Sequence, residues 1–433
     1  MKKCVIFAVI ICFLFLSDSY AQGIIKSIPV KIDSASIVRT YSCDTWVVCS
    51  MHDEQCSFSL VTDTGMTVAV LPLPPLVEGY CVVNDFEILG DSVFFCGYIK
   101  GRMPPLTNAV FGYFNINAFF SMSAIEYFRI PPVMTLTKMD LYVDNGRPHV
   151  VMIGALNLSF HVVVDARVIS STLWDFDIAD YRYQYGLEDF LFDDVAVAND
   201  YVYVSFRNYD DSTASVLIFT KPMTYSSILN GAYEINSLGF YADSPVLIEH
   251  CNANVFSVLT SLDTNNIVVG FYNEIYCISV WKAVKSSFQC RDIKVNSSNP
   301  NEVDVLLKIK NKEVSWSEII TSVPMQTGGG KPIVVNVHKY DSHDIYSLDY
   351  ICCQDRLIAS GQLDGNRTLY LYRCDRHRWD CEELSFSIFS KEYYYPGWWP
   401  HEVIKKFAQI ESVQKESSPA TVRATNICQP DVK

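Results

Sequence analysis

The chain has 433 residues, with 34 Lys and Arg against 48 Asp and Glu, 49% apolar residues, 13% aromatic residues and 15 cysteines. A charged fraction of 19% and 18 scattered prolines exclude disorder, a coiled coil and a collagen-like repeat as descriptions of the whole chain. The net charge of -14 disfavours nucleic acid and anionic membranes as partners, because binding to either depends on Lys and Arg neutralising phosphates.

Residues 1–21 have the pattern of a cleaved signal peptide. Two lysines precede an apolar run over residues 4–16, and Ser19 and Ala21 are the small residues that signal peptidase reads. The run is shorter than the ~20 residues that a membrane-spanning helix needs. We therefore expect cleavage after Ala21, no membrane span, and a soluble protein exported to the periplasm or the extracellular space.

Export would change what the cysteines indicate. The signal peptide holds two of the 15 cysteines, and the 13 that remain are an odd number. In an oxidising compartment, cysteines close in sequence are candidate disulfides. The alternative is that most are small buried hydrophobic residues. None of the close pairs has the spacing of a zinc finger, so no metal site is expected. The candidate pairs are Cys49 with Cys56, Cys81 with Cys96, Cys277 with Cys290, and Cys374 with Cys381.

An internal repeat is the most informative feature of the sequence. Asp85 begins an alternating apolar strand, Gly90 and Asp91 form a polar turn, and a second strand ends at Gly97. Similar copies begin at Asp140, Asp194 and Asp349, looser copies at Asp44 and Asp304, and a poor copy near Glu249. Successive copies are 41, 55, 54, 55, 55 and 45 residues apart. Periods in this range are typical of arrays and propellers.

Each copy predicts two antiparallel strands joined by a tight turn. Third strands are predicted at 109–114, 214–220 and 368–373. A sheet of three or four strands cannot bury both faces alone, and radial stacking of such sheets solves this problem. Over roughly residues 30–390 the pattern resembles the β-propeller repeat superfamily. This resemblance implies an all-β fold with about seven blades, and six or eight remain open because residues 225–335 are poorly periodic.

The chain therefore divides into a signal peptide (1–21), a β-propeller domain (22–390) and a C-terminal segment (391–433). The last segment contains the aromatic run 393–399, followed by apolar residues at helical spacing over 401–416. We expect a short amphipathic helix there, packed on the propeller.

The repeated aspartates are the first candidate ligand-binding residues. Asp85, Asp140, Asp194 and Asp349 each precede the strand predicted to be innermost, which places them near one mouth of the central channel. A ring of carboxylates there could hold a cation or a polyhydroxyl ligand. The alternative is that each Asp caps its turn through backbone N–H groups.

Aromatic side chains are the second set of candidates. Trp398 and Trp399 could form a platform for sugars, although such runs also pack terminal helices onto β-structure. Tyr183 and Tyr185 lie in an aromatic and acidic stretch that has the composition of either a binding loop or an ordinary polar connection.

Two classes of function fit these features. The first is a non-enzymatic exported propeller that binds a protein or glycan partner, and it needs only the repeat and the export signal. The second is an extracellular polysaccharide hydrolase or lyase that uses carboxylates at the channel mouth. The first is favoured because no catalytic constellation stands out. No cofactor is expected, and the oligomeric state stays open.

Overall fold

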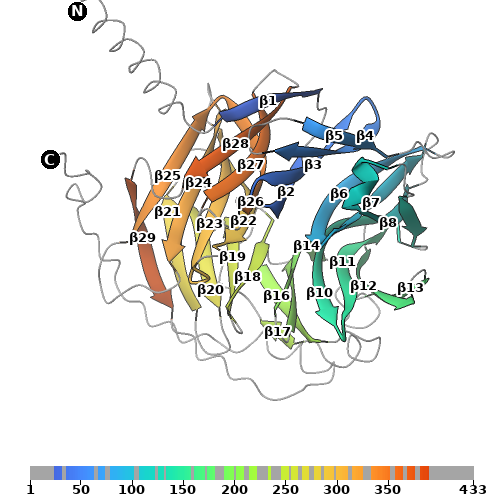
Figure 1. Ribbon diagram of the computed structural model, residues 1–433. Helices are drawn as coiled ribbons and strands as arrows, with labels where there is room; N and C mark the ends of the chain where they lie inside the picture. The colour runs from blue at the N-terminus through green and yellow to red at the C-terminus, as the bar shows by residue number, and fades with distance from the viewer. Residues whose placement is uncertain are drawn as a thin grey trace, which may run out of the picture.

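A computed structural model gives the fold of the chain, and most of the residues it describes lie in β-strands. These residues are 24–31, 36–62, 67–73, 79–101, 107–121, 125–130, 133–157, 160–170, 173–180, 190–198, 201–208, 214–221, 233–235, 245–252, 255–261, 266–272, 277–283, 287–296, 299–310, 315–324, 333–351, 356–363, 368–375 and 381–389. Antiparallel sheets stand around a central axis, which confirms the predicted all-β β-propeller (Figure 1).

Four of the sheets are four-stranded meanders in which each strand pairs with the next one along the chain. The first contains β2 (Ile37–Ser42), β3 (Thr45–His52), β4 (Gln55–Thr62) and β5 (Thr67–Pro72). The second contains β6 (Gly79–Leu89), β7 (Ser92–Gly101), β8 (Thr107–Asn115) and β9 (Glu126–Arg129). The third contains β10 (Thr135–Asp144), β11 (Arg147–Asn157), β12 (Phe160–Ser170) and β13 (Leu173–Asp180). The fourth contains β14 (Phe190–Val197), β15 (Tyr201–Asn208), β16 (Ala214–Thr220) and β17 (Tyr233–Ile235).

A fifth sheet has nine strands and contains two further four-strand units. The first unit is β18 (Leu247–Asn252), β19 (Val255–Ser261), β20 (Asn266–Tyr272) and β21 (Cys277–Ala283). The second is β22 (Ser287–Val295), β23 (Glu302–Lys310), β24 (Ser315–Pro324) and β25 (Ile333–Asp341). The late strand β29 (Cys381–Phe389) pairs with both β21 and β25 and joins the outer edges of the two units.

The last sheet is completed by the start of the chain. It contains β26 (His343–Ile351), β27 (Arg356–Leu363) and β28 (Thr368–Asp375), and β1 (Ile24–Lys31) pairs with β28 as its outermost strand. Strands from the two ends of the chain thus lie in one sheet, which closes the ring of sheets and covers an edge that would otherwise be open.

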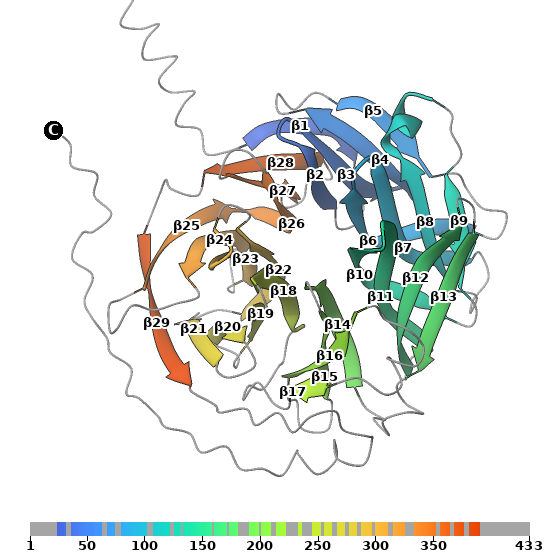
Figure 2. The same cartoon turned by 60° about the horizontal axis from the view of Figure 1, so that its bottom comes forward.

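Seven strands surround the axis and contact one another in a closed ring: β2, β6, β10, β14, β18, β22 and β26 (Figure 2). The sequence predicted about seven blades, with six or eight open, and the structure has six sheets. The sheet count is lower than the number of innermost strands because β29 hydrogen-bonds two neighbouring four-strand units into one sheet.

The hydrophobic core lies between neighbouring sheets, because alternate residues of each strand point to opposite faces. On β7, Val93 and Phe95 belong to the cluster shared with the first sheet, whereas Phe94 and Cys96 belong to the cluster shared with the third. Aromatic rings fill the first interface, where the rings of Phe58 and Phe86 meet edge to face at 5.3 Å. The high aromatic content of the sequence is therefore used for packing between sheets.

The recurring glycine of the repeat has a specific structural reason. Gly97, Gly154 and Gly361 pair with β6, β10 and β26, directly before a bulge in each of these innermost strands. A Cβ atom at these glycines would lie 1.9 Å, 2.1 Å and 2.4 Å from a backbone carbonyl oxygen of the paired strand. Only glycine permits this approach. The bulges that follow set which side chains point to the axis.

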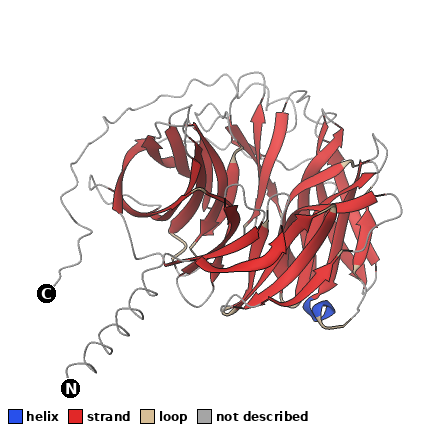
Figure 3. Cartoon of the chain, turned by 90° about the horizontal axis from the view of Figure 1, so that it is seen from above, coloured by secondary structure: helices blue, strands red, loops and turns tan. Residues whose placement is uncertain are grey.

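Several predicted strands are confirmed, because 109–114 lies within β8, 214–220 coincides with β16, and 368–373 lies within β28. In the part of the chain that the structure describes, the one helix is the short η1 (Ile116–Phe119) between β8 and β9 (Figure 3). The amphipathic helix predicted over 401–416 lies outside the described residues.

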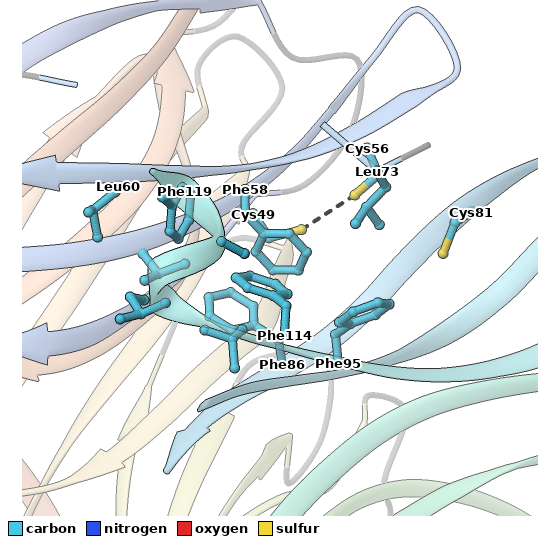
Figure 4. Close-up of a cluster of buried hydrophobic side chains, with 14 of the residues drawn as sticks. Cys49, Cys56, Phe58, Leu60, Leu73, Cys81, Phe86, Phe95, Phe114 and Phe119 are labelled. Atoms are coloured by element: carbon cyan, nitrogen blue, oxygen red, sulfur yellow. Dashed lines mark hydrogen bonds between the residues drawn. The ribbon is translucent and has the colours of Figure 1, made fainter. Parts of the chain in front are cut away.

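The cysteines are mainly buried hydrophobic residues in the described structure. Cys49, Cys56, Cys81 and Cys96 are free thiols, and Cys290 is a buried cysteine. The sulfur atoms of Cys49 and Cys56 lie 3.4 Å apart inside an aromatic cluster (Figure 4). The predicted pair Cys81 with Cys96 is wrong, because the two cysteines occupy core clusters on opposite faces of their sheet. Cys290 packs in the core, and the side chain of Cys277, its predicted partner, lies outside the described residues. The side chains of Cys374 and Cys381 lie outside the description.

Candidate functional site

Three innermost strands, β6, β10 and β22, carry two charged residues two positions apart directly after the bulge: Asp85 with Glu87, Lys138 with Asp140, and Asp292 with Lys294. Residues two apart in a strand share a face, so both members of each pair point the same way. Charge interactions cross the ring, for example between Arg39 of β2 and Asp292 of β22, and between Glu87 of β6 and Lys294 of β22. We call this group the axial cluster; it consists of Arg39, Asp85, Glu87, Lys138, Asp140, Asp194, Glu249, Asp292, Lys294 and Asp349.

Aspartates of the axial cluster tie each innermost strand to the next. Asp85 Oδ1 accepts a hydrogen bond from the following N–H of Phe86 (3.0 Å), and its Oδ2 accepts one from the N–H of Met139 on β10 (3.3 Å). Asp194 repeats the arrangement with Val195 (3.0 Å) and with Ile248 on β18 (3.1 Å). One carboxylate thus satisfies two backbone donors on different strands.

Three more aspartates join further strands in this way. Asp140 accepts from Leu141 and from Val197 on β14, Asp292 accepts from Ile293 and from Leu348 on β26, and Asp349 accepts from Thr40 on β2. A hydrogen bond to a carboxylate that stays ionised contributes about 1.5–3 kcal/mol, and one to a neutral acceptor about 0.5–1.5 kcal/mol. Five junctions between innermost strands are therefore held by an aspartate.

Ion pairs hold the two junctions that remain. Between β2 and β6, Arg39 Nη2 lies 2.9 Å from Asp85 Oδ1 and Arg39 Nε lies 2.7 Å from Glu87 Oε1. Between β18 and β22, Lys294 Nζ lies 3.6 Å from Glu249 Oε2. Lys138 adds a longer contact of 3.9 Å to Asp85 Oδ2. The axial cluster thus contributes to every junction in the ring.

The cluster has more carboxylates than cations, and burial raises the pKa of several acids. Burial raises the pKa of Glu249 to about 7, with Lys294 opposing the rise, and raises the pKa of Asp194 to about 6, with Lys138 opposing it. The pKa of Asp140 lies well above its ordinary value because of burial and the nearby Glu87 and Glu249. Proton uptake by these acids reduces the negative excess near neutral pH.

The four predicted aspartates Asp85, Asp140, Asp194 and Asp349 come together in this cluster, but they lie within the innermost strands rather than before them. Their backbone hydrogen bonds resemble the capping alternative, although they link strands instead of closing turns. The copies proposed at Asp44 and Asp304 are misaligned: Asp44 lies in the turn between β2 and β3, and Asp304 is buried on the second strand β23.

Sequence reasoning missed several members of the cluster. Asp292 and Lys294 lie on β22, the first strand of their unit, whereas the sequence repeat placed the start of this unit at Asp304, on the second strand β23. The signal that could have found them is a pair of charged residues two apart in an otherwise apolar strand, as in Asp85 with Glu87. The other candidates, Tyr183, Tyr185, Trp398 and Trp399, lie outside the described residues.

Among the described residues, no group of three His, Cys, Asp or Glu side chains is arranged so that it could hold a metal ion. Within the same residues, no helix has the length and apolar character needed to cross a membrane.

Comparisons with known proteins assign the chain to no family. No family model matches the chain, and a search of curated proteins found no relative. The extracellular domains 1-2 of Drosophila Semaphorin 1a align with a TM-score of 0.47 at 8% identity, over 82% of this chain and 89% of that chain. Drosophila Semaphorin 2a aligns with a TM-score of 0.48 at 10% identity, over 77% of this chain and 72% of that chain.

An enzyme is also among the solved structures of similar fold. The intramolecular trans-sialidase from Ruminococcus gnavus aligns with a TM-score of 0.38 at 10% identity, over 82% of this chain and 98% of that chain. Similarities at this level do not indicate a function for this chain, because one fold hosts many unrelated functions.

Proposed function

We propose that the protein is an exported β-propeller that binds a glycan or a protein partner and leaves it chemically unchanged. The observation that carries this proposal is the use of the axial carboxylates: Asp85 and Asp194 each accept two backbone N–H groups on neighbouring strands. Carboxylates committed in this way stabilise the ring and have little freedom to act as nucleophile or base.

We therefore expect the side chains that recognise the partner to lie away from the axis. Propeller loops vary without disturbing the stacked sheets, and binding residues are often found on loops held by a rigid scaffold. The predicted signal peptide supports an extracellular or periplasmic partner. Cys43, between β2 and β3, is disulfide-bonded, which fits an oxidising compartment.

The alternative function is a polysaccharide hydrolase or lyase, and one observation favours it. Glu249 has a pKa raised to about 7 by burial, and a carboxyl group with such a pKa can act as a general acid near neutral pH. However, Glu249 also forms an ion pair with Lys294 that joins β18 and β22, and this structural role needs no catalytic function. We therefore place this function second.

A glycan array followed by product analysis separates the two. Purified mature protein is applied to the array, and each bound glycan is then incubated with the protein and analysed by mass spectrometry. Binding without change in mass is expected. Shortened or unsaturated products formed by the wild type, lost in Glu249→Gln and retained in the matched control Glu126→Gln on β9, would establish the enzyme instead.

A further inference from the structure

Two cationic side chains, those of Arg291 and Lys308, contact the same carboxylate oxygen of Asp344. Arg291 Nη2 lies 3.5 Å from Asp344 Oδ1, and Lys308 Nζ lies 3.3 Å from the same atom. Arg291 lies on β22, Lys308 on β23 and Asp344 on β26, so the three residues meet where two of the four-strand units contact each other. Their local charge is positive in a protein that is acidic overall.

The Arg291 pair differs from two other arginine pairs in the described structure, those of Arg207 and Arg167. Arg207 contacts both oxygens of Asp193 at 2.7 Å, and Arg167 lies 2.6 Å from Asp175. Charge-assisted hydrogen bonds are usually 2.7–2.9 Å long. The Nε atom of Arg291 and the Oδ1 atom of Asp344 are buried and have no hydrogen-bond partner. The guanidinium is therefore positioned near an anion but not satisfied by it.

The local backbone places a tyrosine beside this guanidinium. Arg291 and Tyr346 occupy the bulge position of β22 and β26, directly before Asp292 and Ser347. Bulges often re-aim side chains next to binding sites. The guanidinium carbon of Arg291 lies 5.5 Å from the centre of the Tyr346 ring, and the Tyr346 hydroxyl accepts a hydrogen bond of 2.6 Å from Gln362.

From this arrangement we propose that Arg291 and Lys308 bind the carboxylate of an acidic sugar, with Asp344 occupying the cations when no ligand is present. The planar fork of a guanidinium matches a carboxylate in two parallel hydrogen bonds. Tyr346 and Gln362 supply an aromatic surface and polar atoms of the kind that suit a sugar ring and its hydroxyls. The side chains of Arg291 and Asp344 are 24% and 20% exposed and that of Lys308 is 12% exposed, while the shared Oδ1 atom of Asp344 is buried.

This inference rests on the proposed function and names the ligand class for it. It has a direct consequence, because Asp344 competes with the ligand for the same two cations. Replacing the carboxylate by an amide removes the competitor, so Asp344→Asn should bind an acidic sugar more tightly than the wild type. A purely structural ion pair would not produce this gain.

The test is a calorimetric titration of the purified mature protein with D-galacturonate, with D-galactose as the neutral sugar and N-acetyl-L-glutamate as a non-sugar carboxylate. We expect galacturonate alone to bind, Arg291→Gln to weaken its binding about ten-fold, and Asp344→Asn to tighten it several-fold. Arg291→Lys keeps the positive charge but lacks the planar guanidinium, so its affinity for galacturonate should lie between those of the wild type and Arg291→Gln. The control Arg167→Gln, which removes a similarly exposed arginine on β12, should leave the affinity for galacturonate unchanged.

Three results would overturn the inference. Equal binding of galacturonate and galactose would exclude a carboxylate site. Binding of N-acetyl-L-glutamate at least as tight as that of galacturonate would indicate a peptide ligand. Weaker galacturonate binding by Asp344→Asn, with its melting temperature unchanged, would make the three residues a structural cluster. A glycan or protein partner whose binding is unaffected by Arg291→Gln would leave the proposed function intact and remove this inference alone.

Discussion

Arg39 Nη2 lies 2.9 Å from Asp85 Oδ1, and this contact joins the first two innermost strands of the ring, β2 and β6. Both side chains are buried, and the same guanidinium also contacts Glu87. The arginine therefore compensates two carboxylates at once. Its removal would take the 2.9 Å contact from Asp85 and the 2.7 Å contact from Glu87, and would leave Asp85 with the longer contact to Lys138.

We expect Arg39→Met to lower the free energy of unfolding by about 3–5 kcal/mol, the range found when one partner of a buried ion pair is removed. Urea denaturation of the purified protein measures this. Arg167→Met is the matched control, because the Arg167 and Asp175 side chains are 29% and 42% exposed, and exposed pairs contribute about 0–1 kcal/mol. Equal losses in the two variants would contradict the role assigned to Arg39.

Stability should also depend on pH through the acids with raised pKa values. Glu249 and Asp194 have folded-state pKa values of about 7 and about 6, above those of the unfolded chain. At pH values between the unfolded-state and the folded-state pKa of each group, the folded state binds more protons than the unfolded state. This contribution to stability is complete below the unfolded pKa and is lost as the pH rises through 6 to 7.

The protein should therefore be more stable at pH 5 than at pH 8, by about 1–2 kcal/mol for these two groups, since each full unit of pKa shift corresponds to 1.36 kcal/mol and their partial exposure reduces the effect. Denaturation midpoints across this pH range test the expectation. Glu249→Gln, which mimics the protonated side chain, should flatten the profile. A profile that rises from pH 5 to pH 8 would be inconsistent with burial as the cause of the shifts.

The close approach at Gly97 predicts a strong effect of a single methyl group. In Gly97→Ala the new Cβ would lie 1.9 Å from the carbonyl oxygen of Val82, so β6 and β7 would have to separate at the bulge. We expect a loss of about 3 kcal/mol or more, in the range of other severe steric changes in a core. Thermal unfolding measures it.

Gly90 provides the comparison for this substitution. It has a φ of +58° and open space around its Cα, and Asn adopts that conformation more readily than other residues. Gly90→Asn should therefore cost under about 1 kcal/mol. If Gly97→Ala were as stable as Gly90→Asn, close backbone contact could not explain why glycine recurs at this place in the repeat.

Local sequence patterns predicted much of this fold, because strands and tight turns depend on neighbouring residues. The 54 and 55 residue spacings and the alternation of apolar residues were enough to predict β16 to the residue and to indicate a propeller. The patterns could not predict how β1 and β29 complete distant sheets, since those strands pair with β28, β21 and β25 across long separations.

The candidate site was predicted only in part for a similar reason. Asp85, Asp140, Asp194 and Asp349 were found because they recur, whereas the role of Arg39 depends on Asp85, 46 residues further along the chain. No local pattern announces such a pair. The two misaligned copies failed because an aspartate in a turn and one in a second strand look the same in sequence as one that faces the axis.

The unfolding free energy of Asp194→Ala tests most directly whether the axial aspartates hold the innermost strands together. This change removes the acceptor for the N–H groups of Val195 and Ile248, and a buried donor left unsatisfied costs about 1–3 kcal/mol. We predict a loss of about 2–5 kcal/mol in urea denaturation, with glycan or protein binding retained by the folded variant. Unchanged stability together with lost binding or activity would contradict the account.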